Sequence, residues 1–166
     1  MKKIMTTIVT IVLILVGVIF TIRTALFPIE NKSDIKRIAN EYKIDPYLLA
    51  ELAHFESRFD NKKYESNSNN GILRFSDEAS IKLAKELKMS KFKPKDLVDS
   101  QTSLKLGAYY VSKFNNQGLE TVIREWNVKN GDEDTIDRRA YASQYYLPKI
   151  ERNMKIFKLL YPELQF

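Results

Sequence analysis

The chain has no cysteine, and its only histidine is His54. Without cysteine it cannot form a disulfide framework or a thiolate metal site. His54 lies off the apolar side of its predicted helix and has no partner at metal-ligand spacing, so we expect a residue at the surface or one that supports a neighbouring site. The composition therefore predicts neither a metal nor another cofactor. A length of 166 residues suffices for one compact domain with an appendage.

The chain also lacks a clustered basic stripe, although its net charge is +6. Lys2, Lys3 and Arg23 against Glu30 account for +2 of this charge and leave +4 on residues 31–166. A nucleic-acid binder gathers its basic residues on one face, so nucleic acid is not an expected partner. A solvated, lysine-rich surface explains most of the excess, which also suits an anionic surface such as cell wall or lipid headgroups.

One segment lacks charge altogether. No residue from Ile4 to Ile22 is charged, and a run of this length, about 19 residues, can cross the hydrocarbon core of a membrane as a helix. Lys2 and Lys3 precede the run and only Arg23 follows closely, which favours an N-terminus in the cytoplasm. We therefore predict a single-pass anchor over residues 1–26, with the rest of the chain on the extracytoplasmic side.

A cleaved signal peptide is the alternative, because such peptides also begin with lysines and an apolar core. The run is longer than a usual signal core, and residues 23–28 offer only a poor cleavage site. The uncleaved anchor is favoured over a cleaved, secreted form.

After a tether at residues 27–32, residues 33–166 form one predicted domain. Asp45 followed by Pro46 starts a helix, as do Ser76 and Asp99, and the segment from Phe59 to Phe75 is a long polar loop with room for a short β-hairpin. We predict an all-α domain of five to seven helices, α+β at most by that hairpin. The residues expected in its core are Ile35, Ile38, Ala39, Tyr42, Leu49, Leu52, Ala53, Ile81, Ala84, Leu87, Leu104, Gly107, Tyr110, Val111, Phe114, Leu119, Val122, Ile123, Trp126, Ile150, Met154 and Phe157.

Glu56 is an acid on the apolar side of the helix that starts at Asp45. At about 100° per residue it falls between Leu49 and Leu52, while Glu51 points to the opposite, solvated side. Burial of a carboxylate disfavours its charged form, which is what a general acid needs near neutral pH. The alternative is a glutamate at a frayed helix end, paired with a lysine or arginine.

Five short motifs follow one another between residues 31 and 161, and together they resemble the SLT-type lytic transglycosylases, a lysozyme-like family that cleaves bacterial peptidoglycan. The resemblance implies a lysozyme-like helical domain. The motifs are Tyr42-Lys43-Ile44-Asp45-Pro46 with Glu56-Ser57-Arg58-Phe59, Gly71-Ile72-Leu73, Asp96-Leu97-Val98-Asp99 with Leu104, Gly107 and Tyr109-Tyr110, Trp126-Asn127, and Tyr146-Leu147-Pro148-Lys149-Ile150.

In this family one glutamate, here Glu56, protonates the glycosidic oxygen between N-acetylmuramic acid and N-acetylglucosamine. The same residue then acts as base while the 6-hydroxyl of the muramic acid attacks, which closes a 1,6-anhydro ring. The resemblance therefore implies glycan strands of peptidoglycan as the partner and no metal. The residues it places along the substrate are Ser57, Glu65, Ser66, Arg74, Tyr110, Trp126, Asn127 and Tyr146, with Tyr110, Trp126 and Tyr146 open to an equal interpretation as core aromatics.

This chain departs from the family pattern near the predicted site. Glu65 and Arg74 replace a serine and a glutamine, and because they carry opposite charges in one loop we expect them to pair. Ser66 or Ser68 could supply the lost hydroxyl. The turn of small residues expected after Asn127 is Val128-Lys129-Asn130.

These departures keep two alternatives open. One is a catalytically weak wall-binding or scaffold module of the same fold. The other is a hydrolase similar to goose-type lysozyme, in which an unpaired Glu65 at about 6.5–9.5 Å from Glu56 activates water.

Overall fold

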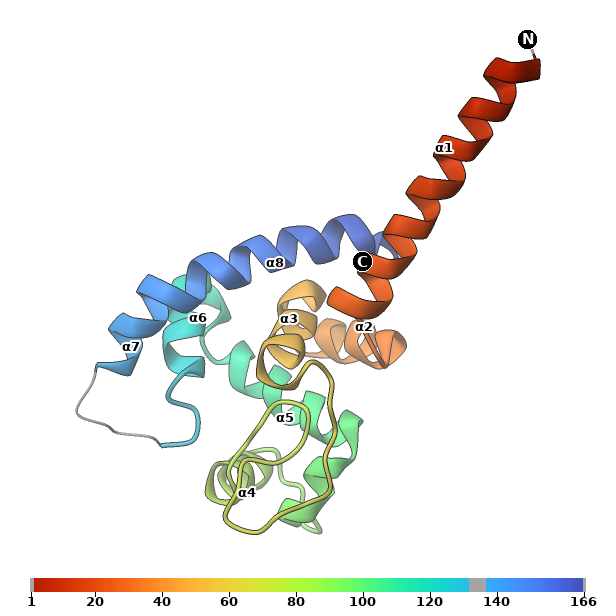
Figure 1. Ribbon diagram of the computed structural model, residues 1–166. Helices are drawn as coiled ribbons and strands as arrows, with labels where there is room; N and C mark the ends of the chain where they lie inside the picture. The colour runs from red at the N-terminus through yellow and green to blue at the C-terminus, as the bar shows by residue number, and fades with distance from the viewer. Residues whose placement is uncertain (1, 132–136, 166) are drawn as a thin grey trace.

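The computed structural model describes residues 2–131 and 137–165, and nearly all of its regular structure is helical (Figure 1). No strand occurs in these residues, and the possible hairpin is reduced to one isolated bridge between Asn70 and Phe75. The predicted all-α class is confirmed. The α-helices are α1 Lys2–Thr21, α2 Lys32–Glu41, α3 Pro46–Ser57, α4 Asp77–Glu86, α5 Ser100–Ser112, α6 Leu119–Trp126, α7 Arg138–Tyr141 and α8 Leu147–Leu160. The 3-10 turns are η2 Pro94–Val98, η3 Asn115–Gln117 and η5 Pro162–Leu164, and the π-helical turns are η1 Ile22–Leu26 and η4 Ala142–Tyr146.

Three helices begin where the capping residues predict. The side chains of Asp45, Ser76 and Asp99 each accept a hydrogen bond from a backbone N–H two or three residues later, and Pro46 occupies the first turn of α3. These bonds satisfy N–H groups that have no partner within the helix. The local chemistry therefore sets the start of α3, and with it the position of Glu56 at the other end.

Helix α3 lies at the centre of the domain, against α2, α5 and α8 (Figure 1). Its residues from Pro46 to Ala53 are all buried. Gly107 on α5 lies directly against the loop before α4, because a Cβ added there would lie 2.2 Å from Leu73 Cδ1. The close packing predicted for Gly107 is confirmed.

Two details of the predicted helices are wrong. Ile81 is 51% exposed, because Leu83 and Ala84 lie on the buried face of α4 instead. The break expected at Pro148 is only a change of helix type, since a π-helical turn precedes this residue and α8 begins around it. Proline is tolerated in the first turn of a helix, where its missing N–H has no helical partner.

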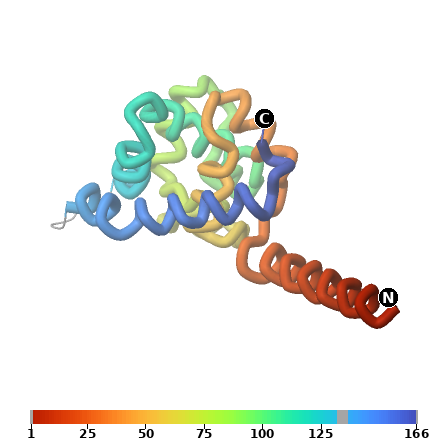
Figure 2. The backbone as a smooth tube through the Cα atoms, turned by 90° about the horizontal axis from the view of Figure 1, so that it is seen from above, coloured from red at the N-terminus to blue at the C-terminus, as the bar shows by residue number. Residues whose placement is uncertain are grey.

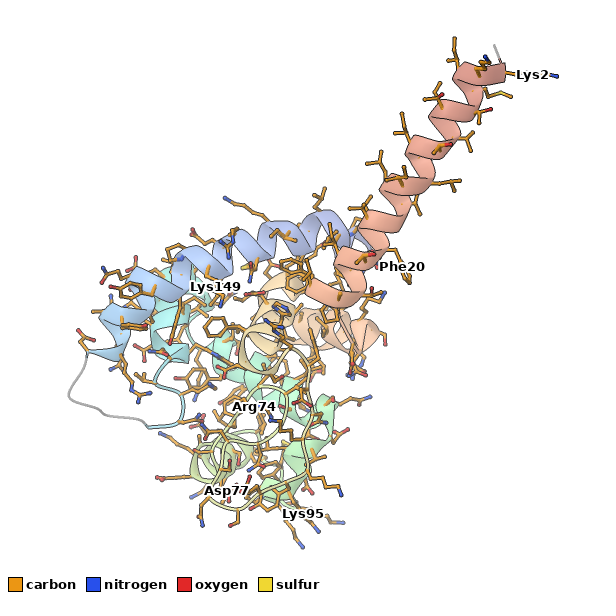
Figure 3. All side chains as sticks on the ribbon, in the orientation of Figure 1. Lys2, Phe20, Arg74, Asp77, Lys95 and Lys149 are labelled. Carbon is orange, nitrogen blue, oxygen red and sulfur yellow. The ribbon has the colours of Figure 1, made fainter. Side chains whose placement is uncertain are left out.

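The apolar helix α1 projects away from the domain, and none of its residues is buried (Figures 1 and 2). The turn η1 continues it to Leu26, which makes 25 helical residues with a mean hydropathy of 2.7 over the most apolar stretch. Helix α1 carries Lys2 at its outer end, and Phe20 lies close to the domain (Figure 3). Its length and composition suffice to cross a membrane.

The segment after η1 is packed against the C-terminal end of the domain. The hydroxyl of Tyr161 lies 2.9 Å from the carbonyl oxygen of Arg23 and 2.7 Å from that of Phe27. The guanidinium of Arg23 pairs with Glu163 at 2.8 Å and lies 4.3 Å from the centroid of the Tyr161 ring. The predicted tether is thus held to the domain by specific contacts.

Candidate active site at the end of α3

The last turn of α3 carries Glu56, whose side chain is 17% exposed. Its Oε1 atom accepts a hydrogen bond from the indole N–H of Trp126 at 2.8 Å and another from the ammonium of Lys129 at 2.7 Å. Trp126 ends α6 and is buried, and the Lys129 side chain is 7% exposed. The end of α6 therefore supplies both partners of this carboxylate oxygen.

The other oxygen of Glu56 is in a different situation. Among the described residues none donates a hydrogen bond to Oε2, and the Glu56 side chain as a whole is 17% exposed. The described contacts of the carboxylate therefore fall on Oε1, while the side chain remains partly exposed. This is the arrangement that a proton donor to an external ligand needs.

Lys129 lies among aromatic rings. Its ammonium nitrogen is 4.7 Å from the centroid of the Trp126 ring and 5.9 Å from that of Phe75, and these two rings contact each other edge to face at 5.7 Å. A mostly buried ammonium needs a counter-charge, which Glu56 provides. The sequence interpretation missed Lys129 as a partner of Glu56. The only hint in the sequence was that a large residue stands in a turn where small residues were expected.

The loop that carries Lys129 is fixed on both sides. The Asn127 side chain donates to the carbonyl oxygen of Arg138 at 2.8 Å. The Asn130 side chain donates to the carbonyl oxygen of Arg74 at 2.9 Å and accepts from the backbone N–H of Ser76 at 2.9 Å. These bonds join the loop to α7 and to the start of α4. They explain how Lys129 is held against Glu56, and they show that the Asn127 amide serves the fold.

Tyr146 is a second predicted residue that the structure brings to Glu56. Its ring contacts Phe55 edge to face at 5.0 Å, on the helix that carries Glu56. Burial is the main reason that the pKa of the Tyr146 hydroxyl is raised, and the nearby Tyr141 and the charge of Glu56 add to the effect. Tyr146 therefore lies within the electrostatic field of Glu56.

Ser57 and Tyr110 contribute to the site through the fold. The Ser57 hydroxyl lies 2.8 Å from the carbonyl oxygen of Ile72, which ties the end of α3 to the turn after the long loop. The Tyr110 hydroxyl donates to the carbonyl oxygen of Glu125 at 2.8 Å, and burial raises its pKa to about 12. The Tyr110 ring packs on the edge of Trp126 at 5.9 Å. The core-aromatic interpretation fits Tyr110 and also the ring of Trp126.

The predicted pairing of Glu65 with Arg74 is wrong. The Arg74 guanidinium (labelled in Figure 3) donates to the carbonyl oxygens of Gly71 at 3.0 Å and Asp60 at 2.9 Å, and its acidic neighbour is the Asp60 carboxylate at 3.9 Å. Arg74 has a left-handed backbone (φ 52°), and its side chain folds back over its own turn. Glu65 is exposed, with its backbone bound to the Asn70 side chain.

Ser66, like Glu65, lies on the exposed part of the loop. Its hydroxyl is a neighbour of the Tyr64 phenol. No described contact joins Ser66 or Glu65 to Glu56. The chain's own contacts thus gather Trp126, Lys129 and Tyr146 around Glu56, and leave Glu65 and Ser66 apart from this group.

Glu51 is the largest error of the sequence interpretation. It is completely buried, because α8 covers the side of α3 that was expected to face solvent. The Asn153 side chain donates to Glu51 Oε1 at 2.8 Å, and Glu51 Oε2 lies 3.4 Å from Nδ1 of His54. His54 is therefore not a surface residue either. Its Nε2 lies 3.1 Å from the carbonyl oxygen of Leu26, and its ring stacks on Phe27 at 5.5 Å.

Within residues 2–131 and 137–165, no group of three or more histidine, aspartate or glutamate side chains is arranged to hold a metal ion. The residues gathered around Glu56 include one carboxyl group that could transfer a proton, that of Glu56 itself.

Comparison with known families gives one match. The family model described as the transglycosylase SLT domain matches residues 33–134. This span contains α2 from its second residue and all of α3 to α6, with Glu56, Trp126 and Lys129, whereas α8 lies beyond it. No curated protein matches the chain.

Proposed function

The chain belongs to the transglycosylase SLT domain family, and on that premise we propose that it is a peptidoglycan lytic transglycosylase with Glu56 as its single acid and base. The observation that carries the proposal is the state of the Glu56 carboxyl group. Trp126 and Lys129 bind Oε1, no described residue donates to Oε2, and the side chain is 17% exposed. The family match covers the whole of α3 and the two residues that hold Glu56.

In the proposed reaction, Glu56 carries a proton on Oε2 and gives it to the glycosidic oxygen between N-acetylmuramic acid and N-acetylglucosamine. The bond from C1 to that oxygen breaks, and positive charge develops on the muramic ring. The carboxylate then takes the proton of the 6-hydroxyl while O6 bonds to C1, which yields a 1,6-anhydro end and restores the acid. One carboxyl group thus serves both steps.

The partners of Oε1 have a role in the first step. As the proton leaves Oε2, negative charge develops on the carboxylate. The indole N–H of Trp126 and the ammonium of Lys129 are already in place to stabilise that charge. Tyr146 forms the neighbouring wall through its contact with Phe55.

The deciding experiment treats purified sacculi with the full-length protein in detergent and identifies the released muropeptides by mass. We expect 1,6-anhydro ends. Mostly reducing ends would point to a muramidase that hydrolyses the same bond. Binding to sacculi without soluble products would support the wall-binding module.

The ion pair gives this wall-binding alternative a specific basis. The ammonium of Lys129 lies 2.7 Å from Glu56 Oε1, so this carboxyl group already has a partner within the chain. A protein that uses the pair only for stability would keep the fold and the glycan surface without turnover. Sedimentation with sacculi, measured beside digestion, separates the two functions.

We also propose that α1 anchors the protein in the cell membrane with the domain outside. The length and apolar surface of α1 support this, as do Lys2 and Lys3 at its start. A signal sequence has the same features. The packing of Arg23 and Phe27 on Tyr161 favours retention of the helix, because cleavage in this segment would remove contacts of the domain. We expect the protein to remain in membranes after carbonate washing. A soluble form that begins near Phe27 would contradict the anchor.

A further inference from the structure

Residues 22–29 connect the apolar helix α1 to the domain and pack directly on it; we call them the anchor segment. Its side chains that lie against the domain core are those of Ile22, Phe27 and Ile29. The Phe27 ring stacks on the His54 ring at 5.5 Å between centroids and meets the Phe157 ring edge to face at 5.5 Å. The anchor segment is therefore part of the packed domain.

Polar contacts also fix the position of the anchor segment. The Tyr161 hydroxyl lies 2.9 Å from the carbonyl oxygen of Arg23 and 2.7 Å from that of Phe27. The Arg23 guanidinium pairs with Glu163 at 2.8 Å, and Lys32, just after the segment, pairs with the same carboxylate at 3.4 Å. These partners follow α8, so the end of α1 that meets the domain is held beside the end of α8 (Figures 1 and 2).

One contact of the anchor segment is made by the helix that carries Glu56. Nε2 of His54 on α3 lies 3.1 Å from the carbonyl oxygen of Leu26. His54 precedes Glu56 by two residues, so the dimensions of a histidine side chain and of an α-helix place the Cα atom of Glu56 within about 15 Å of that of Leu26. The candidate catalytic acid is therefore close to the end of the apolar helix.

The sequence of α1 indicates where the membrane surface lies relative to this site. At about 1.5 Å per residue, the helix from Ile4 to Arg23 is about 30 Å long, which equals the thickness of the hydrocarbon core. With α1 across the membrane, the charge of Arg23 lies at the outer edge of that core. Glu56 then lies within about 20 Å of the core, of which the headgroup layer takes up about 5–8 Å.

We propose that the packing of the anchor segment holds the active site at the outer surface of the membrane, so that the enzyme cleaves glycan strands that are still attached to a lipid of that membrane. The inference rests on the proposed lytic function and on the proposed membrane anchor. A reaction that lengthens glycan strands by glycosyl transfer on a membrane lipid must supply this substrate.

The physical reason is reach. A domain on a long flexible linker would meet strands over a wide range of distances from the membrane, with a reach that grows with linker length. Here the anchor segment is bound to the domain through Tyr161, Glu163 and His54, so the site stays near the headgroups. Lipid-attached strands and the cross-linked wall contain the same glycosidic bond, and their distance from the membrane distinguishes them.

The test lengthens the connection without disturbing the domain. A spacer of about 20 glycine and serine residues between Thr21 and Ile22 adds on the order of 25 Å of flexible reach. It leaves the contacts of Arg23, Leu26 and Phe27 with the domain in place. The matched control carries the same spacer before Lys2, at the other end of α1. Both full-length variants should digest sacculi in detergent at the wild-type rate, which shows that they are folded and active.

The first readout measures the position of the site and does not depend on turnover. Trp126 is the only tryptophan of the chain, and its N–H donates to Glu56 Oε1 at 2.8 Å. The proteins are placed in vesicles of phosphatidylethanolamine and phosphatidylglycerol that contain a dansyl-labelled headgroup lipid. Energy transfer from Trp126 to dansyl should be strong in the wild type and in the control, and should fall in the variant with the spacer after Thr21.

The second readout compares two sources of the same bond. Unlabelled vesicles that carry the protein receive either glycan strands polymerised on a lipid of the same vesicles or purified sacculi from outside. The wild type should favour the lipid-attached strands. A flexible spacer lowers the effective concentration of the site at the membrane surface and extends its reach, so the ratio of the two rates should fall by about threefold or more. The control should keep the wild-type ratio.

The outcomes separate the proposals. Equal energy transfer with and without the spacer after Thr21 overturns the placement of the site at the membrane. An equal ratio of the two rates in these proteins, or a wild type that prefers sacculi, overturns the choice of lipid-attached strands. Absence of soluble products from sacculi in detergent overturns the lytic function instead, and the energy transfer would still decide where the site lies.

Discussion

Glu51 and Glu56 are little more than one helical turn apart on α3, and their surroundings differ in both access and partners. Glu51 is completely buried between α3 and α8, where Asn153 and His54 contact its two oxygens. Glu56 is partly exposed at the helix end, and Lys129 and Trp126 hold only one of its oxygens. If burial were the only criterion, Glu51 would be chosen as the catalytic acid. Access to a ligand selects Glu56.

The difference shows that a carboxyl group is useful for catalysis only if it can reach a substrate. Glu51 joins α3 to α8, and through His54 it also joins α3 to the segment that follows the apolar helix. It has the properties of a structural acid. Glu56 combines an oxygen held by Trp126 and Lys129 with a partly exposed side chain, which are the properties of a proton donor.

The largest expected effect separates the two glutamates by activity. Glu56→Gln should reduce sacculus digestion by about 10²–10⁴-fold, because the amide cannot donate the proton. Glu51→Gln should retain digestion within a few-fold, since Glu51 does not reach the surface. Release of muropeptides per unit time measures both. Digestion by Glu56→Gln at the wild-type rate would show that Glu56 is not the acid.

Glu56→Gln has a side effect that needs its own control, because it removes the carboxylate that pairs with the ammonium of Lys129. The double variant Glu56→Gln with Lys129→Met removes both charges. It should recover thermal stability lost by the single variant and remain inactive. Recovered digestion would mean that instability had caused the loss of activity.

The second prediction measures the structural role of Glu51. Asn153→Ala removes the donor to Glu51 Oε1, which then lies buried without a partner, so the free energy of unfolding should fall by about 1–3 kcal/mol. Glu151→Ala, at an exposed position of α8, should change it little. Urea unfolding of the full chain gives both values. Equal stability of the two variants would refute a structural role for the buried acid.

The third prediction concerns the support on the Glu56 side. A Cβ at Gly107 would lie 2.2 Å from Leu73 and 3.5 Å from the Trp126 ring, so Gly107→Ala must displace these side chains. We expect a loss of about 1–3 kcal/mol in stability, with slower digestion because Trp126 moves relative to Glu56. Gly17→Ala on α1, where a Cβ meets nothing within 4 Å, is the control. A fully stable and active Gly107→Ala would show that the packing there can relax.

The smallest effect is expected at a pair near the surface. Hydrogen bonding to Arg139 is the main cause that holds the pKa of the Glu125 carboxyl below its ordinary value. A lowered pKa in the folded state stabilises the protein above the ordinary glutamate value of about 4.3, and this stability is lost as the pH falls through the folded value. Because Arg139 is 47% exposed, we expect well under 1 kcal/mol. Glu125→Gln should lose this part of the acid dependence, and an identical acid profile would show that the pair contributes nothing.

Much of the fold could be predicted from local patterns. The caps at Asp45, Ser76 and Asp99 and the apolar spacing along α3 and α5 were confirmed, because each depends on residues within a few positions of one another. The predictions failed where the burial of a side chain depended on which elements pack on the other sides of its helix. Ile81 and Glu51 were assigned from the periodicity of one helix, which does not reveal what packs on its other sides.

The candidate site also has a part that the sequence predicted and a part that it did not. The position of Glu56 on α3 and the likeness to the SLT family were apparent from residue order, and the family match confirms the latter. The partners of Glu56 were not, because Trp126 and Lys129 are 70 and 73 residues away along the chain. Arg74 likewise carries a charge that the sequence shows, but the left-handed turn around it determines that its neighbour is Asp60 instead of Glu65.

The sequence by itself determined the helical class, the apolar helix at the N-terminus and the helix that carries Glu56, because these follow from hydrophobic spacing and backbone capping within short segments. Only the tertiary structure decided which glutamate of α3 is enclosed and which stays partly exposed. That choice depends on α8 covering one side of α3 and on the loop after α6 bringing an ammonium to its end. Contacts over such distances along the chain form only when the helices pack.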